Sequence, residues 1–298
     1  MERVQTGIRR SAPVLVLAPS LVAIIVFVYV FIGWTFRVSM TSWSGLTPVW
    51  DFIGLQNYFD LFADRRFQID IRNTVLFTVP FVGGSMLLGL FLAILVDQRI
   101  RAESFFRTVY LFPMAVSFIV TGVVWRWLMN PAPGDRTTGL NLLFDIVGLD
   151  GLQNRWFTTP DWGIVAIALP AVWQMSGYTM AIFLAGLRGI PDEVREAALV
   201  DGASSLQLYR RVILPLLRPV TLTALVILGH ISLKVFDLII AVAGKQLQLD
   251  VLAVNMWQTT FDANDYGHGA AIAIFIFVTV AVVLIPYLWT TLRSEARS

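Results

Sequence analysis

The chain has 298 residues, of which 57% are hydrophobic and only 14% are charged. Soluble globular domains carry about 25% charged residues, so this composition excludes an ordinary water-exposed surface and indicates a protein embedded in lipid. The chain has no cysteine and only two histidines, which argues against disulfides and against thiolate or histidine metal clusters. A formal charge of +2 is too small to indicate binding of nucleic acid.

Six segments are long and apolar enough to cross a bilayer, which takes about 20 residues each. Each must be helical, because lipid offers no partner to exposed backbone amides. We therefore expect an all-α integral membrane protein with six transmembrane helices in a single domain, residues 1–298. The first segment is too long for a signal peptide, and we interpret it as a retained helix. The expected spans are residues 14–36, 74–96, 108–129, 162–187, 220–243 and 270–292.

The arginines and lysines that flank these spans predict their orientation. Thirteen lie on the side that includes both termini and seven on the other, and cytoplasmic flanks carry the excess of positive charge. We therefore expect both termini in the cytoplasm. Within the second span, Ser85, Gly89 and Ala93 recur every four residues, which favours close packing inside the helix bundle over a subunit interface.

The predicted cytoplasmic loop at residues 188–219 has the pattern of two short helices joined by a glycine turn. Pro191 suits the first position of a helix, and Asp192 complements the positive end of its dipole. Gly202 stands where a left-handed residue ends a helix, and Ser204 or Ser205 can cap the next one. Two short helices are more than a connection between two spans requires.

The first of these helices places Val194, Ala197 and Ala198 on one face. One interpretation is a helix that lies on lipid headgroups, although such helices usually carry bulky Trp, Phe or Leu on the apolar face. Alanines instead favour insertion into a groove of another protein.

The loop resembles a known motif. Glu196-Ala-Ala198, Asp201-Gly202-Ala203, Tyr209 and Ile213-Leu214-Pro215 are similar to the EAA motif of permease subunits in binding-protein-dependent ABC importers. The resemblance implies the type I ABC importer permease fold and a coupling helix that docks into a cleft of an ATPase subunit. It implies that Glu196 pairs with a basic group, that Ala197 and Ala198 allow close packing, and that Gly202 sets the turn. The expected coupling residues are Glu196, Ala197, Ala198, Asp201, Gly202, Arg210 and Arg211. Arg210 departs from the pattern, since many relatives have an aromatic residue there.

Further segments resemble the carbohydrate branch of this family, in particular permeases for glucose, mannose and α-glucosides. These segments are residues 52–59, 101–123, 188–194, 234–238 and 267–275. Residues 243–251 lack the glycine- and proline-rich segment often found there, which bears on the substrate more than on the fold. The resemblance implies a second homologous permease, two ATPase subunits, a periplasmic or lipid-anchored sugar-binding protein, and a place in the bacterial cytoplasmic membrane.

The chain carries no energy source of its own. A phosphate-binding loop of the type GxxxxGK[ST] is absent, since neither lysine, Lys234 or Lys245, lies in such a context. No catalytic constellation is visible either. We expect a chain that is not an enzyme and holds no cofactor or metal, with ATP and Mg bound by the partner ATPase.

Polar and aromatic residues in the fourth and fifth spans are candidates for a sugar pathway. Lys234 and Asp237 are three residues apart, so they can pair across one helical turn, or they can border the pathway and bind sugar hydroxyls. Gln174, Met175 and Ser232 are included because their positions resemble sugar contacts of maltose-type relatives, and Gly177 would give room. Asn255 and Trp257 are candidates for a periplasmic lip. The full set is Trp173, Gln174, Met175, Tyr178, Ser232, Lys234 and Asp237.

Three alternatives remain open at this stage. The chain could be a secondary transporter driven by an ion gradient, although such proteins carry inverted repeats and need no docking loop. It could be a membrane scaffold that transports nothing. It could also be the same importer machinery with glycerol phosphate or a polyol as cargo.

Overall fold

A computed structural model describes residues 17–98, 101–159 and 161–295, and these residues are mainly helical. They contain two isolated antiparallel bridges, Thr41 with Phe52 and Ser44 with Asp265, and no β-strand. The predicted cytoplasmic termini lie outside the described residues. The α-helices are α2 (Phe31–Val38), α3 (Gln56–Ala63), α4 (Arg65–Asp97), α5 (Glu103–Leu111), α6 (Phe118–Leu128), α7 (Gly139–Ile146), α8 (Gly163–Arg188), α9 (Asp192–Val200), α10 (Ser205–Leu208), α11 (Leu214–Leu216), α12 (Arg218–Leu233), α13 (Asp237–Ala243), α14 (Leu252–Trp257) and α15 (Tyr266–Glu295).

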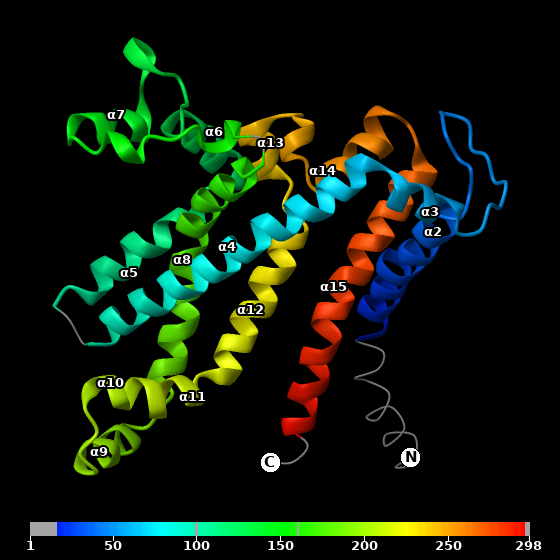
Figure 1. Cartoon of the computed structure of the whole chain (residues 1–298). Coiled ribbons are helices and arrows are strands. Elements are labelled where there is room, and N and C mark those ends of the chain that lie inside the picture. Colours follow the sequence, from blue (N-terminus) through cyan, green and yellow to red (C-terminus); the bar gives the residue numbers. More distant parts are fainter. Residues whose placement is uncertain (1–16, 99–100, 160, 296–298) are drawn as a thin grey trace, which may run out of the picture. The chain divides into compact units, whose positions relative to one another are not determined.

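Shorter and wider helical turns join these helices. The π-helical segments are η1 (Ile25–Val30), η6 (Tyr209–Ile213) and η8 (Gln258–Asp262), and the 3-10 segments are η2 (Phe112–Ala115), η3 (Gly134–Arg136), η4 (Asp150–Leu152), η5 (Trp156–Thr158) and η7 (Leu247–Leu249). By internal contacts the chain forms two compact units, residues 1–64 with 256–277 and residues 65–255 with 278–298. Figure 1 shows the elements in sequence colours. The single domain over residues 1–298 stays a prediction.

Four described helices are long and apolar enough to span a membrane: residues 17–38, 65–97, 163–188 and 266–285. Two bent helix pairs raise the number to six if each pair counts as one span. The prediction of an all-helical membrane protein is therefore confirmed. Two of the predicted spans, residues 108–129 and 220–243, are wrong as continuous helices.

The third predicted span bends by 96° between η2 and α6. Pro113 lies at the start of η2, Val116 is extended with φ −85° and ψ 139°, and the Ser117 hydroxyl caps α6 by accepting from the Val120 amide. The fifth predicted span breaks at residues 234–236, where Phe236 has φ −131° and ψ −62°, so α12 and α13 are separate helices. A hydropathy pattern averaged over a whole span registers neither break, because apolar residues continue through the first and stand on both sides of the second.

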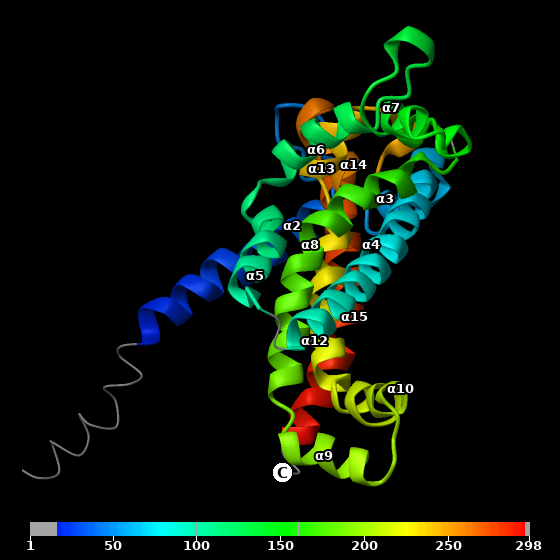
Figure 2. The ribbon, with the colours of Figure 1, turned by 90° about the vertical axis from the view of Figure 1, so that its left-hand side faces the viewer.

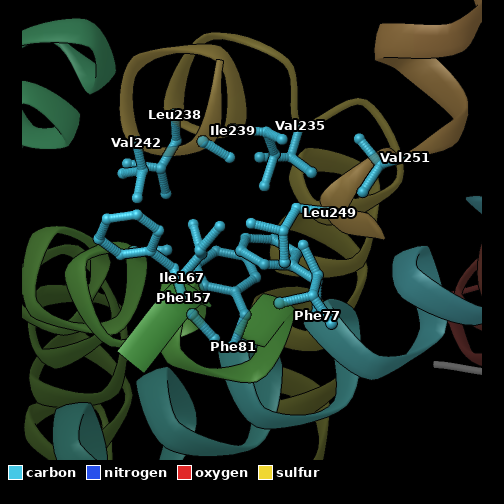
Figure 3. Packing of buried hydrophobic residues seen from close by; sticks show 14 of the residues in the cluster. Phe77, Phe81, Phe157, Ile167, Val235, Leu238, Ile239, Val242, Leu249 and Val251 are labelled. Atoms are coloured by element: carbon cyan, nitrogen blue, oxygen red, sulfur yellow. The ribbon is translucent and has the colours of Figure 1, made fainter. Parts of the chain in front are cut away.

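The second unit is built around α4 and α8. Ser85, Gly89 and Ala93 are buried where these two helices meet, and a β-carbon on Gly89 would lie 2.6 Å from the β-carbon of Thr179. The prediction that this small-residue face packs inside the bundle is confirmed. Figure 3 shows Phe77 and Phe81 of α4, with Phe157 and Ile167, facing aliphatic side chains from α13 and residues 249–251.

The helix α4 begins nine residues before the predicted span, and its first turns are polar. Arg66 binds Asp250, Asn73 donates to the carbonyl oxygen of Asp250 at 2.8 Å, and Asn255 donates to the buried carboxylate of Asp70. Burial raises the pKa of the Asp250 carboxyl, while the hydrogen bond and charge of Arg66 act in the opposite direction. Asn255 is 2% exposed, so its assignment to a periplasmic lip is wrong.

The first unit contains residues 52–59 and 267–275, two of the segments that resemble carbohydrate permeases, and its contacts give them a structural role. Asn57 is buried and donates to the carbonyl oxygens of Ser39 and Thr41, each at 2.9 Å. Gly267 at the start of α15 lies against the same place, since a β-carbon there would meet the Thr41 carbonyl oxygen at 2.5 Å. Residues 52–59 and 267–275 of this unit therefore pack against the same stretch of backbone, around Thr41.

The contact of Gly89 with α8 generates a stability prediction. Gly89→Ala forces the added methyl against Thr179 and the backbone of Met180, and overpacking of this kind costs about 1–3 kcal/mol. We expect a lower thermal unfolding temperature for the purified variant in detergent. Gly83→Ala is the matched control on the same helix, because no atom lies within 4 Å of its added methyl. Equal unfolding temperatures for the two variants would contradict the close approach of α4 and α8.

Candidate coupling and pathway sites

The coupling segment, residues 189–217, connects α8 to α12. Gly202 has φ +82° and ends the first helix, as predicted. The Ser204 hydroxyl accepts from the Gln207 amide while the Gln207 side chain accepts from the Ser204 amide, which forms a capping box on α10. Pro191 is the N-cap of α9 rather than its first helical residue. The predicted pair of short helices with a glycine turn is thus confirmed.

One face of this segment is open to solvent. Glu196, Ala197, Asp201, Arg210 and Arg211 are all exposed. The same segment also exposes large apolar side chains, Leu199 at 53%, Val200 at 88% and Leu206 at 77%. The sequence analysis did not include these three residues among the coupling residues, because it considered only the alanines as apolar contacts. They could have been identified as large apolar residues that fall outside the buried face of a short helix.

The opposite face packs against α4 and α8. Ala198 contacts a buried cluster that joins Ala93 and Val96 of α4, Leu184 and Leu187 of α8, and Leu208 and Ile213 of the coupling segment. The small side chain of Ala198 therefore lets α9 approach its own helix bundle. Ala197, which is exposed, is the alanine available for contact with another subunit.

Polar contacts strengthen this attachment. Arg195 of α9 donates to the Asp97 carboxylate and to the Leu187 carbonyl oxygen, both at 2.9 Å. The Gln98 amide donates to the Tyr209 hydroxyl at 3.0 Å. A polar groove of about 880 Å³ runs beside α9, and its lining includes Asp97, Glu103, Arg188, Asp192, Arg195 and Glu196. Sequence reasoning counted Arg195 only as a cytoplasmic charge.

The three pathway residues chosen by resemblance point into the protein. Gln174 is 3% exposed and donates to the Val116 carbonyl oxygen at 2.6 Å, at the bend between η2 and α6. Ser232 is fully buried, donates to the Gly229 carbonyl oxygen at 2.8 Å and accepts from the Thr78 hydroxyl at 3.1 Å. Met175 belongs to the buried cluster of Figure 3.

Lys234 and Asp237 lie on the two sides of the break between α12 and α13. Both are exposed, and no ion pair between them is found in the described residues. Of the two alternatives for these residues, pairing across one helical turn is wrong, because no continuous helix connects them. Both side chains line a cavity of about 100 Å³ whose other walls include Phe77, Phe81 and Phe118.

The remaining candidate residues of the fourth span are not among the residues that line this cavity. Trp173 is 39% exposed and its ring centroid lies 6.1 Å from that of Trp125. Tyr178 is half-buried against the apolar cluster of Figure 3. Gly177 does not give room to a ligand, because a β-carbon there would lie 1.8 Å from the Tyr110 carbonyl oxygen. The structure therefore brings together Lys234 and Asp237, but not the whole predicted set.

Within the second unit, the two candidate sites lie at opposite ends. Figures 1 and 2 show α9 and α10 at one end of α8, and α13, which begins at Asp237, near the other end. The long helices α4 and α8 connect the two ends. A displacement applied to the coupling segment can therefore reach the cavity beside Lys234 through packed helices.

Residues 85–294 match the family described as binding-protein-dependent transport system inner membrane component. The chain belongs to this family. A probable ABC transporter permease protein of Pyrococcus horikoshii is 44% identical over 286 residues, which are 95% of this chain and 97% of that protein. A xylose/arabinose import permease protein of Haloferax volcanii is 37% identical over 88% of this chain and 82% of its own length.

A solved structure shares the fold of the whole chain. It is the crystal structure of a bacterial ABC transporter involved in the import of the polysaccharide alginate, with a TM-score of 0.79 and 21% identity, and it covers 98% of this chain and 99% of that one. Family membership makes the chain a permease and a multi-pass protein of the cytoplasmic membrane. It also disfavours the ion-driven secondary transporter and the scaffold that transports nothing.

The turn at Gly202 generates a prediction for the coupling segment. No atom lies within 4 Å of a β-carbon built on Gly202, so a substitution there is strained by its positive φ alone. Gly202→Ala should destabilise the turn by about 1–2 kcal/mol, whereas Gly202→Asn should cost less because asparagine tolerates this conformation.

The measurement is hydrogen exchange of residues 192–208 in the purified protein. We expect faster exchange in Gly202→Ala than in Gly202→Asn, with the native protein slowest. Identical exchange in all three proteins would show that the segment does not depend on a left-handed residue.

Proposed function

We propose that this chain is a transmembrane permease subunit of an ATP-driven sugar importer. The observation that carries the proposal is the coupling segment, which exposes apolar and charged side chains while its other face is fixed to α4 and α8. A cytoplasmic segment that presents Leu199, Val200 and Leu206 to water needs a protein partner, because large exposed apolar side chains in a group mark interaction sites.

The names of relatives support a sugar as the cargo. Relatives of this chain at 30% identity or more are named as permeases for xylose and arabinose, for trehalose and maltose, and for α-glucosides. Glucose or a related mono- or oligosaccharide is the cargo we propose. Glycerol phosphate or another polyol would need a specific observation that the chain does not offer.

The partners we propose follow from this function. Two ATPase subunits would bind and hydrolyse ATP with Mg, and the exposed face of α9 would dock onto one of them, with Glu196 paired to a basic group. A second homologous permease would complete the pathway. A periplasmic or lipid-anchored sugar-binding protein would deliver the sugar, in keeping with the description of the family.

Sugar transfer would follow alternating access, in which ATP binding closes the ATPases and moves the helix bundle between outward-open and inward-open states. The cavity beside Lys234 and Asp237 measures about 100 Å³, whereas pockets that hold small ligands measure about 300–1,000 Å³. We infer that this cavity must widen before a sugar can pass. Widening would separate the walls contributed by α4, α6 and the break after α12.

Purification of the tagged chain from its native membranes tests the proposed function. An ATPase subunit and a second permease should co-purify in detergent. In proteoliposomes, the complex should hydrolyse ATP faster when its binding protein carries the correct sugar, and a panel of sugars would identify the cargo. Uptake that follows an ion gradient without ATP would refute the proposal.

Lys234 and Asp237 generate a prediction within that assay. Because both side chains are exposed beside the cavity, Lys234→Gln and Asp237→Asn should change folding stability by less than about 0.5 kcal/mol. We expect each to lower the sugar-stimulated rate of transport several-fold. Lys245→Gln is the matched control, since Lys245 is the only other lysine and does not line this cavity. Normal transport by both variants would remove these residues from the pathway.

A further inference from the structure

We infer that Arg195 is a positioning residue which fastens the coupling helix α9 to the ends of α4 and α8, so that a push on α9 moves these two helices as one body. The inference rests on the proposed function, because it assumes that an ATPase subunit acts on α9. It differs from the docking role of Glu196, since Arg195 faces the interior of its own chain.

The geometry of Arg195 is that of a bridge between two helices. One guanidinium nitrogen, Nη1, donates to the Asp97 carboxylate at the last residue of α4. The other, Nη2, donates to the carbonyl oxygen of Leu187 in the last turn of α8. The side chains of Arg195 and Asp97 are 22% and 7% exposed, so both charges are largely removed from water. A pair with this burial is costly to break, because either partner alone leaves an uncompensated charge.

Arginine is the residue type that this position requires. Its planar guanidinium presents several N–H donors in a fixed fork, so a single side chain can contact two acceptors at once. Lysine offers one point charge and cannot hold both acceptors in the same geometry. The last carbonyls of a helix have no partner within the helix, and the positive charge of Arg195 is favourable at this end of α8.

The Asp97 carboxylate is electrostatically unfavourable at its position unless Arg195 compensates its charge. A carboxylate at the C-terminal end of a helix lies at the negative end of the helix dipole, where a cation is preferred. Glu103, which is also near the groove, is bound to Arg188 at 2.7 Å and to Arg107 at 3.6 Å. The ion pair between Asp97 and Arg195, at 2.9 Å, therefore supplies the charge that stabilises the end of α4.

The packing around this bridge makes α4 and α8 the stiff route out of the coupling segment. Ala198, Leu208 and Ile213 belong to the same apolar cluster as the ends of α4 and α8. The hydrogen bond from Gln98 to Tyr209 adds a second polar connection to the residue that follows α4. The covalent route into α12 instead passes through a bend of 65° between residues 216 and 218.

The test uses the complete importer in proteoliposomes and measures sugar molecules transported per ATP hydrolysed. Arg195→Gln should lower this ratio at least fivefold while the ATPase subunit still co-purifies, because α9 can move without carrying α4 and α8. Arg195→Lys should fall between the native protein and Arg195→Gln. Arg195→Gln combined with Asp97→Asn should recover folding stability but not the transport ratio, because the second change removes the carboxylate left buried by the first without restoring the bridge.

A matched control separates positioning from general charge loss. Arg107→Gln removes an arginine that pairs with Glu103 and whose side chain is 46% exposed; within the described part of the chain it makes no hydrogen bond or ion pair with α9. We expect its transport ratio to equal that of the native complex. Thermal unfolding of each variant is measured alongside. If Arg195→Gln does not fold, Asp97→Glu takes its place, because the longer carboxylate displaces the same ion pair, and it should lower the ratio without loss of assembly.

Two outcomes would overturn the inference. One is a native ratio in the folded Arg195 or Asp97 variants. The other is loss of ATPase binding in Arg195→Gln, which would assign Arg195 to the docking surface. Neither outcome affects the proposed function, which is tested on the native complex by its ATP hydrolysis in response to a loaded binding protein and by the dependence of uptake on ATP.

Discussion

A helix that breaks inside a membrane protein exposes backbone groups that water cannot reach, and the hydrogen bond from Gln174 to the Val116 carbonyl meets that need. Lipid supplies no partner for such a group, so irregular backbone within a membrane-spanning segment requires a protein donor. Gln174 lies in the middle of α8, and its amide reaches the bend between η2 and α6. This hydrogen bond therefore attaches the third span to α8 at the bend itself.

The same helix carries the other close contacts of the second unit. Gly177, one turn further along α8, allows the backbone at Tyr110 to approach, and the Gly89 face of α4 packs on α8 next to it. At its end, Leu187 accepts a hydrogen bond from Arg195 of the coupling helix. Since packed interiors are stiff and deform little, a displacement of α9 under the proposed function would be passed to α4, to the bend at Val116 and so to α6. We infer that α8 is the helix that connects the coupling segment with the proposed pathway, because it contacts both.

Much of this architecture could be predicted from the sequence because the signals are local. Hydropathy locates the apolar helices, the glycine at position 202 fixes a turn, and a serine two residues after that glycine indicates the cap of the next helix. The small residues Ser85, Gly89 and Ala93 of α4 also predict a close contact with another helix. In each case the residue type alone restricts the backbone or the packing, so no knowledge of distant parts of the chain is needed.

The rest depends on pairings across the chain that a single sequence does not reveal. Asp97 and Arg195 are 98 residues apart and Gln174 and Val116 are 58 apart, so neither pair leaves a local pattern. Lys234 and Asp237 have the spacing of a helical pair, yet the break at residues 234–236 depends on how α13 packs against α6. Gly122 of α6 shows that contact, since a β-carbon there would lie 2.5 Å from the β-carbon of Ala241. The break thus coincides with a long-range contact between α6 and α13, and it places Lys234 and Asp237 at the cavity. The sequence associated these two residues with a pathway only through their charge.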